Sequence, residues 1–406
     1  MKPSVKLKSL VMGLIVSDRR RRLQRLRYGL TRRLRGRPPC VHYFHQVEDP
    51  YSHIVVQKLA VLAARYRVRF CVHLTSAPLP EFQGDESRFY LWALRDARDI
   101  AAFYGAELPG EAEGVDAVDS VQADNAVSQL AGVVAGAVDG GVNRAVDGAR
   151  EVNGAVDAAA FGQQATALGD KLWRGQTVEP GTGDPVAARA SGDATREHLG
   201  HYLSATFYFE GEWYWGPDRL YHLEQRLTAM GLSREPTAPL CVPRPIAEPI
   251  TGKGADIMLE YFPSLRSPYS AISFSRTLDL VQRSGVSLRL KPVMPMMMRG
   301  VPAPRAKQLY IMRDTKREAQ AAGIPFGKIV DPFGEPVKRA FSLLPHLRSI
   351  GKDVEFVGSY LRAAWAEGID ITTDAGLKVV VERAGVDWGE ASEHLGAPGY
   401  MDLLEA

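Results

Sequence analysis

An internal repeat constrains the fold of this chain more than any other feature of its sequence. The stretches HYFHQVEDPYS and EYFPSLRSPYS begin at His42 and Glu260 and align at an offset of 218 positions. The same offset, without a gap, joins the Arg-Asp pair that begins at Arg95 to the pair that begins at Arg313. Several matches at one offset are hard to obtain by chance. The sequence therefore predicts a tandem duplication.

Each copy contains the same succession of predicted elements. A short apolar strand, CVHYFH or DIMLEYF, leads through a turn to DPYS or SPYS, which begins an amphipathic helix. A second apolar strand follows at 68–74 in the first copy and at 286–293 in the second. A strand, a crossover helix and another strand form a βαβ unit with a parallel, right-handed connection. The predicted fold class is α/β, with two domains in a chain of 406 residues.

Composition places the boundaries of these domains. Residues 1–37 form a basic, helical N-terminal arm, and the first domain covers 38–232. A linker rich in proline and glycine covers 233–255, and the second domain covers 256–406. Within the first domain, residues from about 110–165 are biased toward Ala, Val, Gly and Asp. We expect either a helical insert or a flexible excursion there, since each glycine disfavours a helix.

The arm carries most of the excess positive charge. Thirteen Lys and Arg residues stand against one acid in it, a net +12 that leaves −9 for the rest of a chain whose total is +3. Nucleic acid is therefore not an expected partner. Leucines recur among the arginines at helical spacing, at Leu23, Leu26, Leu30 and Leu34. Either the arm, residues 1–37, lies on an anionic membrane surface, or it packs its leucines on the protein and leaves its arginines in water.

Cysteines and histidines bear on the compartment and on metals. The cysteines are Cys40, Cys71 and Cys241. Their odd number, their wide separation and the lack of a C-x-x-C motif argue against a disulfide framework and favour a reducing compartment. We therefore expect a cytoplasmic protein, with a peripheral membrane position as the alternative that the arm allows. The histidines His42, His45, His53 and His73 lack a second pair at ligand spacing, and no metal site is predicted.

The motifs of both copies resemble those of one superfamily. In the second copy they are YF-x4-SPYS at 261–270, the helix with Tyr310, Arg313 and Asp314, and WAEGIDI at 365–371; in the first they are YF-x4-DPYS, the helix with Arg95 and Asp96, GDKLWRG and TFYFEGEWYWGPDRL. On these motifs the chain resembles the DsbA-like branch of the thioredoxin superfamily, and within it the kappa-class glutathione transferases and 2-hydroxychromene-2-carboxylate isomerases. The resemblance implies two tandem thioredoxin-like domains. Each would carry an α-helical insertion, at 88–195 and 303–400.

Ser267 is the candidate catalytic residue. Ser-Pro is a favoured helix start, and a hydroxyl there stands among unpaired backbone N–H groups at the positive end of a helix. In the resembling enzymes this serine donates a hydrogen bond to the sulfur of glutathione. The resemblance thus implies glutathione as cofactor, held at Ser267, Tyr269 and Ser270. A plain helix cap is the alternative. Dithiol exchange by these motifs lacks a nucleophile, so an oxidoreductase remains a family label only.

The first copy departs from this pattern at two places. Asp49 stands where Ser267 would stand, and an ionised carboxylate repels a thiolate and has no proton to donate. The family's cis-proline aligns with Ser204 and Ala205, and we predict a trans peptide there because a cis bond before alanine costs about 2.5–4 kcal/mol. We therefore expect Asp49, Tyr51, Ser52, Ser204 and Ala205 to form a degenerate counterpart. A protonated Asp49 acting as a general acid is the alternative.

The second copy has its own gap and a candidate substrate pocket. The sequence stops before any counterpart of the TFYFEGEWYWG hairpin, so we expect a truncated chain, an edge covered by the first copy, or an incomplete second domain. Met296, Met297 and Met298 give a soft apolar surface for an aromatic or electrophilic substrate, or else fill the core; Arg299 is placed to meet a carboxylate. The leading hypothesis is a glutathione-dependent isomerase or transferase. The rival is a non-catalytic thioredoxin-fold binding module.

Overall fold

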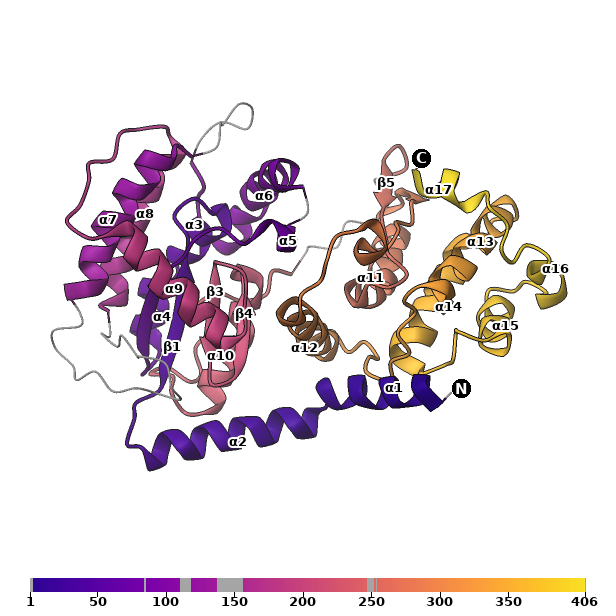
Figure 1. Cartoon of the computed structure of the whole chain (residues 1–406), viewed down its shortest axis with the longest axis horizontal. Coiled ribbons are helices and arrows are strands. Elements are labelled where there is room, and N and C mark those ends of the chain that lie inside the picture. The colour runs from indigo at the N-terminus through magenta and orange to yellow at the C-terminus, as the bar shows by residue number, and fades with distance from the viewer. Residues whose placement is uncertain are drawn as a thin grey trace. The chain divides into compact units, whose positions relative to one another are not determined.

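The protein divides into two compact units. The computed structural model describes residues 3–83, 85–109, 118–136, 156–246, 252 and 254–405. The first unit is Gln24–Ile246, and the second unit is Ala247–Ala406 together with Met1–Leu23. The elements of each unit can be followed along the chain in Figure 1.

The first unit is built on a four-stranded sheet. Its strands are β1 (Cys40–His45), β2 (Arg69–Leu74), β3 (Thr206–Phe209) and β4 (Glu212–Trp215). Their order is β2-β1-β3-β4. β1 and β2 pair in parallel, and the other pairs are antiparallel. Short helices α3 (Pro50–Val56) and α4 (Leu59–Arg65) connect β1 to β2, so the parallel βαβ connection is as predicted.

The remaining helices of the first unit lie between β2 and β3, with one after β4. They are α5 (Pro80–Gln83), α6 (Glu86–Ala101), α7 (Ser120–Gly136), α8 (Ala158–Trp173), α9 (Pro185–Leu199) and α10 (Leu220–Ala229). α9 packs closely on β2. Gly192 of α9 lies so near to Leu74 of β2 that a Cβ atom there would overlap the Leu74 carbonyl. The described ends of the biased segment at 110–165 are helical, in α7 and α8. The rest of that segment lies outside the described residues.

The second unit repeats the β-α-β start. Strands β5 (Met258–Tyr261) and β6 (Ser287–Leu290) pair in parallel and are connected by α11 (Pro268–Ser284). Met258 pairs with Ser287, and in the first unit Cys40 pairs with Arg69. Cys40 lies 218 positions before Met258, and Arg69 lies 218 positions before Ser287. The strand register therefore repeats at the offset found in the sequence.

Helices make up the rest of the second unit. They are α1 (Pro3–Ile15), α12 (Arg305–Ala321), α13 (Glu335–Ser349), α14 (Asp353–Arg362) with a π turn at Ala363–Glu367, α15 (Asp374–Arg383), α16 (Trp388–Ser392) and α17 (Tyr400–Glu405). Their apolar faces enclose a core with Phe341, Phe356 and Tyr360 fully buried at its centre. Among the described residues of this unit, β5 and β6 alone form its sheet.

The arm consists of two helices, α1 and α2 (Asp18–Leu34). Of the two alternatives for the arm, the one in which the leucines of α2 pack on the protein is wrong. Leu23, Leu26, Leu30 and Leu34 are 59%, 68%, 60% and 79% exposed. Within the described part of the chain, no helix has both the length and the apolar content needed to cross a bilayer.

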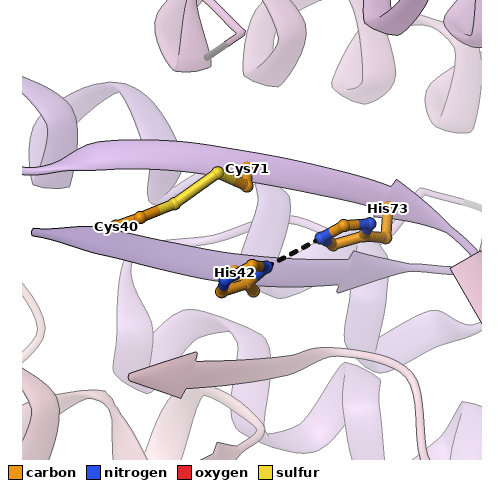
Figure 2. The surroundings of a disulfide bond; sticks show 4 residues. All are labelled: Cys40, His42, Cys71 and His73. Atoms are coloured by element: carbon orange, nitrogen blue, oxygen red, sulfur yellow. Dashed lines mark hydrogen bonds between the residues drawn. A yellow bond between two sulfur atoms is a disulfide. The ribbon is translucent and has the colours of Figure 1, made fainter. Parts of the chain in front are cut away.

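A disulfide corrects the prediction made for the cysteines. Cys40 and Cys71 are joined, as Figure 2 shows, although 31 positions separate them in the chain. They meet because β1 and β2 are neighbours, which brings their Cα atoms to 6.6 Å. Two positions further along the same strands, His42 Nδ1 lies 3.0 Å from His73 Nε2. The cysteines therefore no longer support the inference of a reducing compartment.

Candidate functional site

Ser267 begins α11 as the sequence predicts. Its backbone is extended (φ −86°, ψ 120°), and its Oγ accepts the backbone N–H of Ser270 at 3.2 Å. Pro268 follows in the first helical position. The Ser270 hydroxyl in turn accepts the backbone N–H of Ser264 at 3.1 Å, which holds the preceding loop against the helix. Ser267 is half-buried and so is not sealed beneath packed side chains.

A cation and a thioether lie next to Ser267. The Arg266 guanidinium forms a two-pronged ion pair with Asp331, with distances of 2.9 and 3.2 Å, and lies 4.4 Å from the ring centroid of Phe333. Its Nη1 also approaches the sulfur of Met297 to 2.9 Å. Arg266 and Asp331 were missed by sequence reasoning, because nothing in the sequence indicates that two residues so far apart pair.

The predicted methionine pocket is only partly assembled at this place. Met296–Arg299 form a short 3-10 turn. Met297 contacts Arg266, whereas Met298 packs on the core of the second unit, as the filler alternative predicts. Arg299 is exposed. Met297 is therefore the methionine of this turn that a direct contact places beside the start of α11.

Tyr269 anchors the helix start to α12. Its hydroxyl donates to Oδ2 of the buried Asp314 at 2.8 Å. Asp314 also accepts a hydrogen bond from Arg317 at 2.6 Å, so the acceptor of the Tyr269 hydroxyl is part of an ion pair. This contact fixes the orientation of α11 relative to α12. The role that the structure gives to the Tyr269 hydroxyl is thus to position the helix.

The same hydrogen bonds recur in the first unit. Tyr51 donates to Asp96 at 2.6 Å, and the Ser52 hydroxyl accepts from the backbone N–H of Gln46 at 3.3 Å. Asp49 caps α3 with both oxygens, accepting the backbone N–H groups of Tyr51 (3.3 Å) and Ser52 (2.9 Å) and the Ser52 hydroxyl (2.7 Å). Each counterpart in the second unit lies 218 positions later. The two helix starts differ chemically at the capping residue.

Burial changes the acidity of Asp49. Removal from water raises the pKa of its carboxyl to about 6, and the hydrogen bonds from Ser52 and Tyr51 oppose this shift only in part. The carboxylate of Glu48 adds a smaller rise in the same direction. A carboxyl with a pKa near neutrality can exist in both protonation states, which is the condition that a general acid requires.

The predicted trans peptide at Ala205 is confirmed, since no described peptide bond is cis. Ala205 instead adopts a left-handed backbone, with φ 53°. The preceding Ser204 is buried, and its hydroxyl lies 3.0 Å from Oε1 of Gln46, 3.1 Å from the hydroxyl of Thr75 and 3.3 Å from a guanidinium nitrogen of Arg196. A buried polar side-chain network therefore lies directly before Ala205.

A cavity adjoins the helix start of the first unit. Its volume is about 790 Å³, and its walls include Asp49, Tyr51, Phe89, Ser204 and Trp215. Residues that the sequence assigned to a degenerate counterpart thus line a space of ligand size. The cavity of about 620 Å³ in the second unit lies elsewhere, with walls that include Phe274, Leu278, Ile324, Trp365 and Arg383 rather than Ser267 or the methionine turn.

Comparisons with known proteins give one matching domain family. Residues 258–406 match the DSBA-like thioredoxin domain family. Among solved structures, 2-hydroxychromene-2-carboxylate isomerase is similar at 20% identity, with a TM-score of 0.32 over 37% of this chain and 76% of the other. A protein from Nitrosomonas europaea assigned as a disulfide isomerase is 15% identical, with a TM-score of 0.30 over 36% and 74%.

A protein from Streptomyces coelicolor described as a DsbA oxidoreductase is 17% identical, with a TM-score of 0.29 over 37% of this chain and 72% of the other. No curated protein matches. The matched family segment begins at Met258, the first residue of β5. The protein is therefore a mixed α/β protein whose C-terminal part is a DsbA-like thioredoxin domain.

Proposed function

We propose that the second unit is a glutathione-dependent isomerase or transferase of the kappa or 2-hydroxychromene-2-carboxylate isomerase type, in which Ser267 stabilises the thiolate of glutathione. The observation that supports this most is the accessible cap of α11, a helix of 17 residues. The Ser267 oxygen already accepts one backbone N–H, so its own hydrogen can be directed to a ligand. Unpaired N–H groups of the first turn favour a thiolate over a thiol.

The proposed substrate is a small aromatic or electrophilic molecule. Met297 offers a polarisable surface beside the Arg266 guanidinium, which Asp331 and Phe333 hold in place. Arg299, two positions after Met297, is exposed and would attract an acidic group on the substrate. Dithiol exchange is not proposed, because no cysteine occupies position 49, 52, 267 or 270.

We further infer that the two units arose by tandem duplication and that the first no longer binds glutathione. The repeated hydrogen bonds and the repeated strand register support the duplication. The Asp49 carboxylate would repel a thiolate at the position where Ser267 would donate to one. The alternative for the whole chain is a non-catalytic thioredoxin-fold protein that binds another partner.

Calorimetric titration of the full chain with reduced glutathione tests the proposal. Ser267→Ala is expected to weaken binding about tenfold or more, because a hydrogen bond to a charged group contributes roughly 1.5–3 kcal/mol. Ser267→Asp keeps a helix cap but adds a negative charge, and it should abolish binding. Ultraviolet absorbance of the bound thiolate provides a second measurement, since it reports the ionisation of the sulfur directly.

Asp49→Asn is the matched control, because it keeps a capping side chain at the equivalent position of the first unit. It should leave glutathione affinity unchanged. Loss of binding in Asp49→Asn with normal binding in Ser267→Ala would place the ligand in the first-unit cavity and overturn the assignment to Ser267. A wild-type chain that binds no glutathione would favour the non-catalytic alternative. Circular dichroism melts of each variant separate lost binding from lost folding.

A further inference from the structure

Helix α2 is seated on the first unit by its charged face. Arg25 forms a two-pronged ion pair with Glu212 at 2.5 and 2.9 Å, and Arg32 pairs with Glu210 at 2.6 Å. Gln24 donates to the carbonyl of Gly211 at 3.1 Å. Arg25 and Arg32 are seven positions, about two helical turns, apart and lie on one face of the helix, with Gln24 next to Arg25. These three side chains dock α2 on the turn between β3 and β4.

The leucines of α2 therefore face outward. Leu23, Leu26, Leu30 and Leu34 are each more than half exposed, with values of 59–79%. An amphipathic helix on a globular protein ordinarily buries its apolar stripe and leaves its charges in water. In α2 the arrangement is reversed: arginines bind the protein while leucines meet the solvent. Single exposed leucines are common, but a stripe of four at helical spacing indicates that something else covers it.

Helix α1 also exposes a leucine stripe, although it packs on the second unit through apolar side chains. Val5, Met12 and Ile15 pack on the core of that unit, next to the buried Val16. On the outer side, a second apolar stripe is formed by Leu7, Leu10, Val11 and Leu14, which are 64%, 66%, 47% and 63% exposed. These positions have the spacing of one helix face. Both helices of the arm thus offer leucine stripes that no described residue covers.

Charge identifies what could cover these stripes. Exposed basic residues flank the leucines, namely Lys6, Lys8, Arg19, Arg20, Arg22, Arg27 and Arg33. A second copy of the arm would bring like charges together, which opposes self-association through this face. Nucleic acid would take the arginines but leave the leucines in water. A surface that is apolar beneath and anionic above satisfies both kinds of side chain, and an anionic lipid bilayer has this structure.

We propose that each helix of the arm, α1 and α2, acts as an interfacial anchor that lies in the surface of an anionic lipid bilayer. The leucines enter the boundary of the acyl chains, and the flanking arginines and lysines pair with the headgroups. The ion pairs of Arg25 and Arg32 with the β3–β4 turn keep the first unit attached to α2 while its leucines are in the lipid. This inference does not depend on the proposed enzymatic activity.

Vesicle flotation with the full chain tests the anchor. The wild type should float with vesicles of phosphatidylcholine and phosphatidylglycerol, bind pure phosphatidylcholine much more weakly, and lose affinity as salt is added, because screening weakens the attraction to anionic headgroups. Leu26→Glu combined with Leu30→Glu should lower the partition coefficient by about tenfold or more. Arg22→Gln combined with Arg27→Gln should lower binding to the anionic vesicles and reduce the salt dependence.

The matched control is Val121→Glu combined with Val186→Glu. These valines are 61% and 73% exposed on α7 and α9, so the charge change is the same at positions remote in sequence from the arm. The control should float as the wild type does. A wild type that stays unbound at low salt, or a leucine variant that floats normally, would overturn the proposal. So would light scattering that shows a dimer dependent on the leucines, or a duplex DNA shift that the leucine variant retains in full.

Discussion

Asp49 and Ser267 adopt nearly the same backbone conformation, with φ and ψ of −93° and 119° in one case and −86° and 120° in the other. Each caps a helix that begins with proline. The equivalence ends at the side chain, because a hydroxyl can donate a hydrogen bond and an ionised carboxylate cannot. The two helix starts therefore share a backbone conformation and differ in the group they present, a hydroxyl at Ser267 and a carboxyl at Asp49.

The raised pKa of Asp49 predicts a pH-dependent stability. Because its folded pKa of about 6 lies above the ordinary 3.8, this group stabilises the fold fully below pH 3.8 and loses that contribution as pH rises through about 6. Asp49→Asn should therefore gain stability relative to the wild type between about pH 4 and pH 7, by roughly 1–2 kcal/mol after allowance for solvent screening. Urea titrations at each pH measure the difference.

A difference that is flat across this range would contradict the assignment of a raised pKa. The variant comparison is necessary because other groups titrate in the same range with the opposite sign. Burial lowers the pKa of His42 to about 4, because the folded protein favours the neutral imidazole. The contribution of His42 to stability is therefore lost as pH falls. Subtracting the wild-type curve from that of Asp49→Asn removes this shared contribution.

At the scale of elements, the sequence predicted the first two strands of each copy and their parallel pairing, while contacts between other elements were not predicted. The sequence places β1, β2, β5 and β6 correctly because alternating and continuous apolar runs reflect local burial. It predicts one helix between β1 and β2, but the structure has two. Helix α3 ends with its C-cap at Gln57, and α4 begins after its N-cap at Lys58. Helix periodicity alone does not detect such a break.

Contacts made through tertiary structure account for the remaining errors. The Cys40–Cys71 disulfide depends on which strands are neighbours, and the spacing of cysteines in a sequence does not contain that information. The leucine spacing of the arm identified an apolar face correctly, but it could not say that Glu210 and Glu212 would bind the opposite face. The first-unit cavity was missed because its walls come from distant segments.

The disulfide predicts that reduction weakens the first unit. Closing a loop across a separation of 31 residues limits the unfolded chain and contributes about 3–4 kcal/mol by the entropic argument. Cys40→Ser combined with Cys71→Ser should lower the melting temperature in the absence of reductant. The wild type in dithiothreitol should melt as this variant does.

Cys241→Ser is the control, since Cys241 is a free cysteine. This variant should keep the wild-type melting temperature and the wild-type response to dithiothreitol. A wild type whose melting is unaffected by reductant would show that the bridge is absent or energetically neutral. Mass mapping of peptides under non-reducing conditions decides between these two explanations.

At the scale of the whole molecule, the described residues form two separate apolar cores. The core of the first unit is formed between Val41 and Val242, whereas that of the second runs from Leu265 to Ala391 with Val16 added from the N-terminal arm. Sequence composition predicted two domains, but it did not predict that Met1–Leu23 would cluster with Ala247–Ala406. Amphipathic periodicity shows that a helix has a face to bury, and the identity of its partner emerges only on folding.

Two cores predict two unfolding transitions in differential scanning calorimetry, because each unit buries its own apolar side chains. Leu59→Ala empties space in the first core and Leu344→Ala in the second, and both side chains are fully buried. Each should destabilise its own unit by about 2–5 kcal/mol. Leu59→Ala should move one transition and Leu344→Ala the other. A single transition that both variants shift together would instead mean that the two units unfold as one cooperative body.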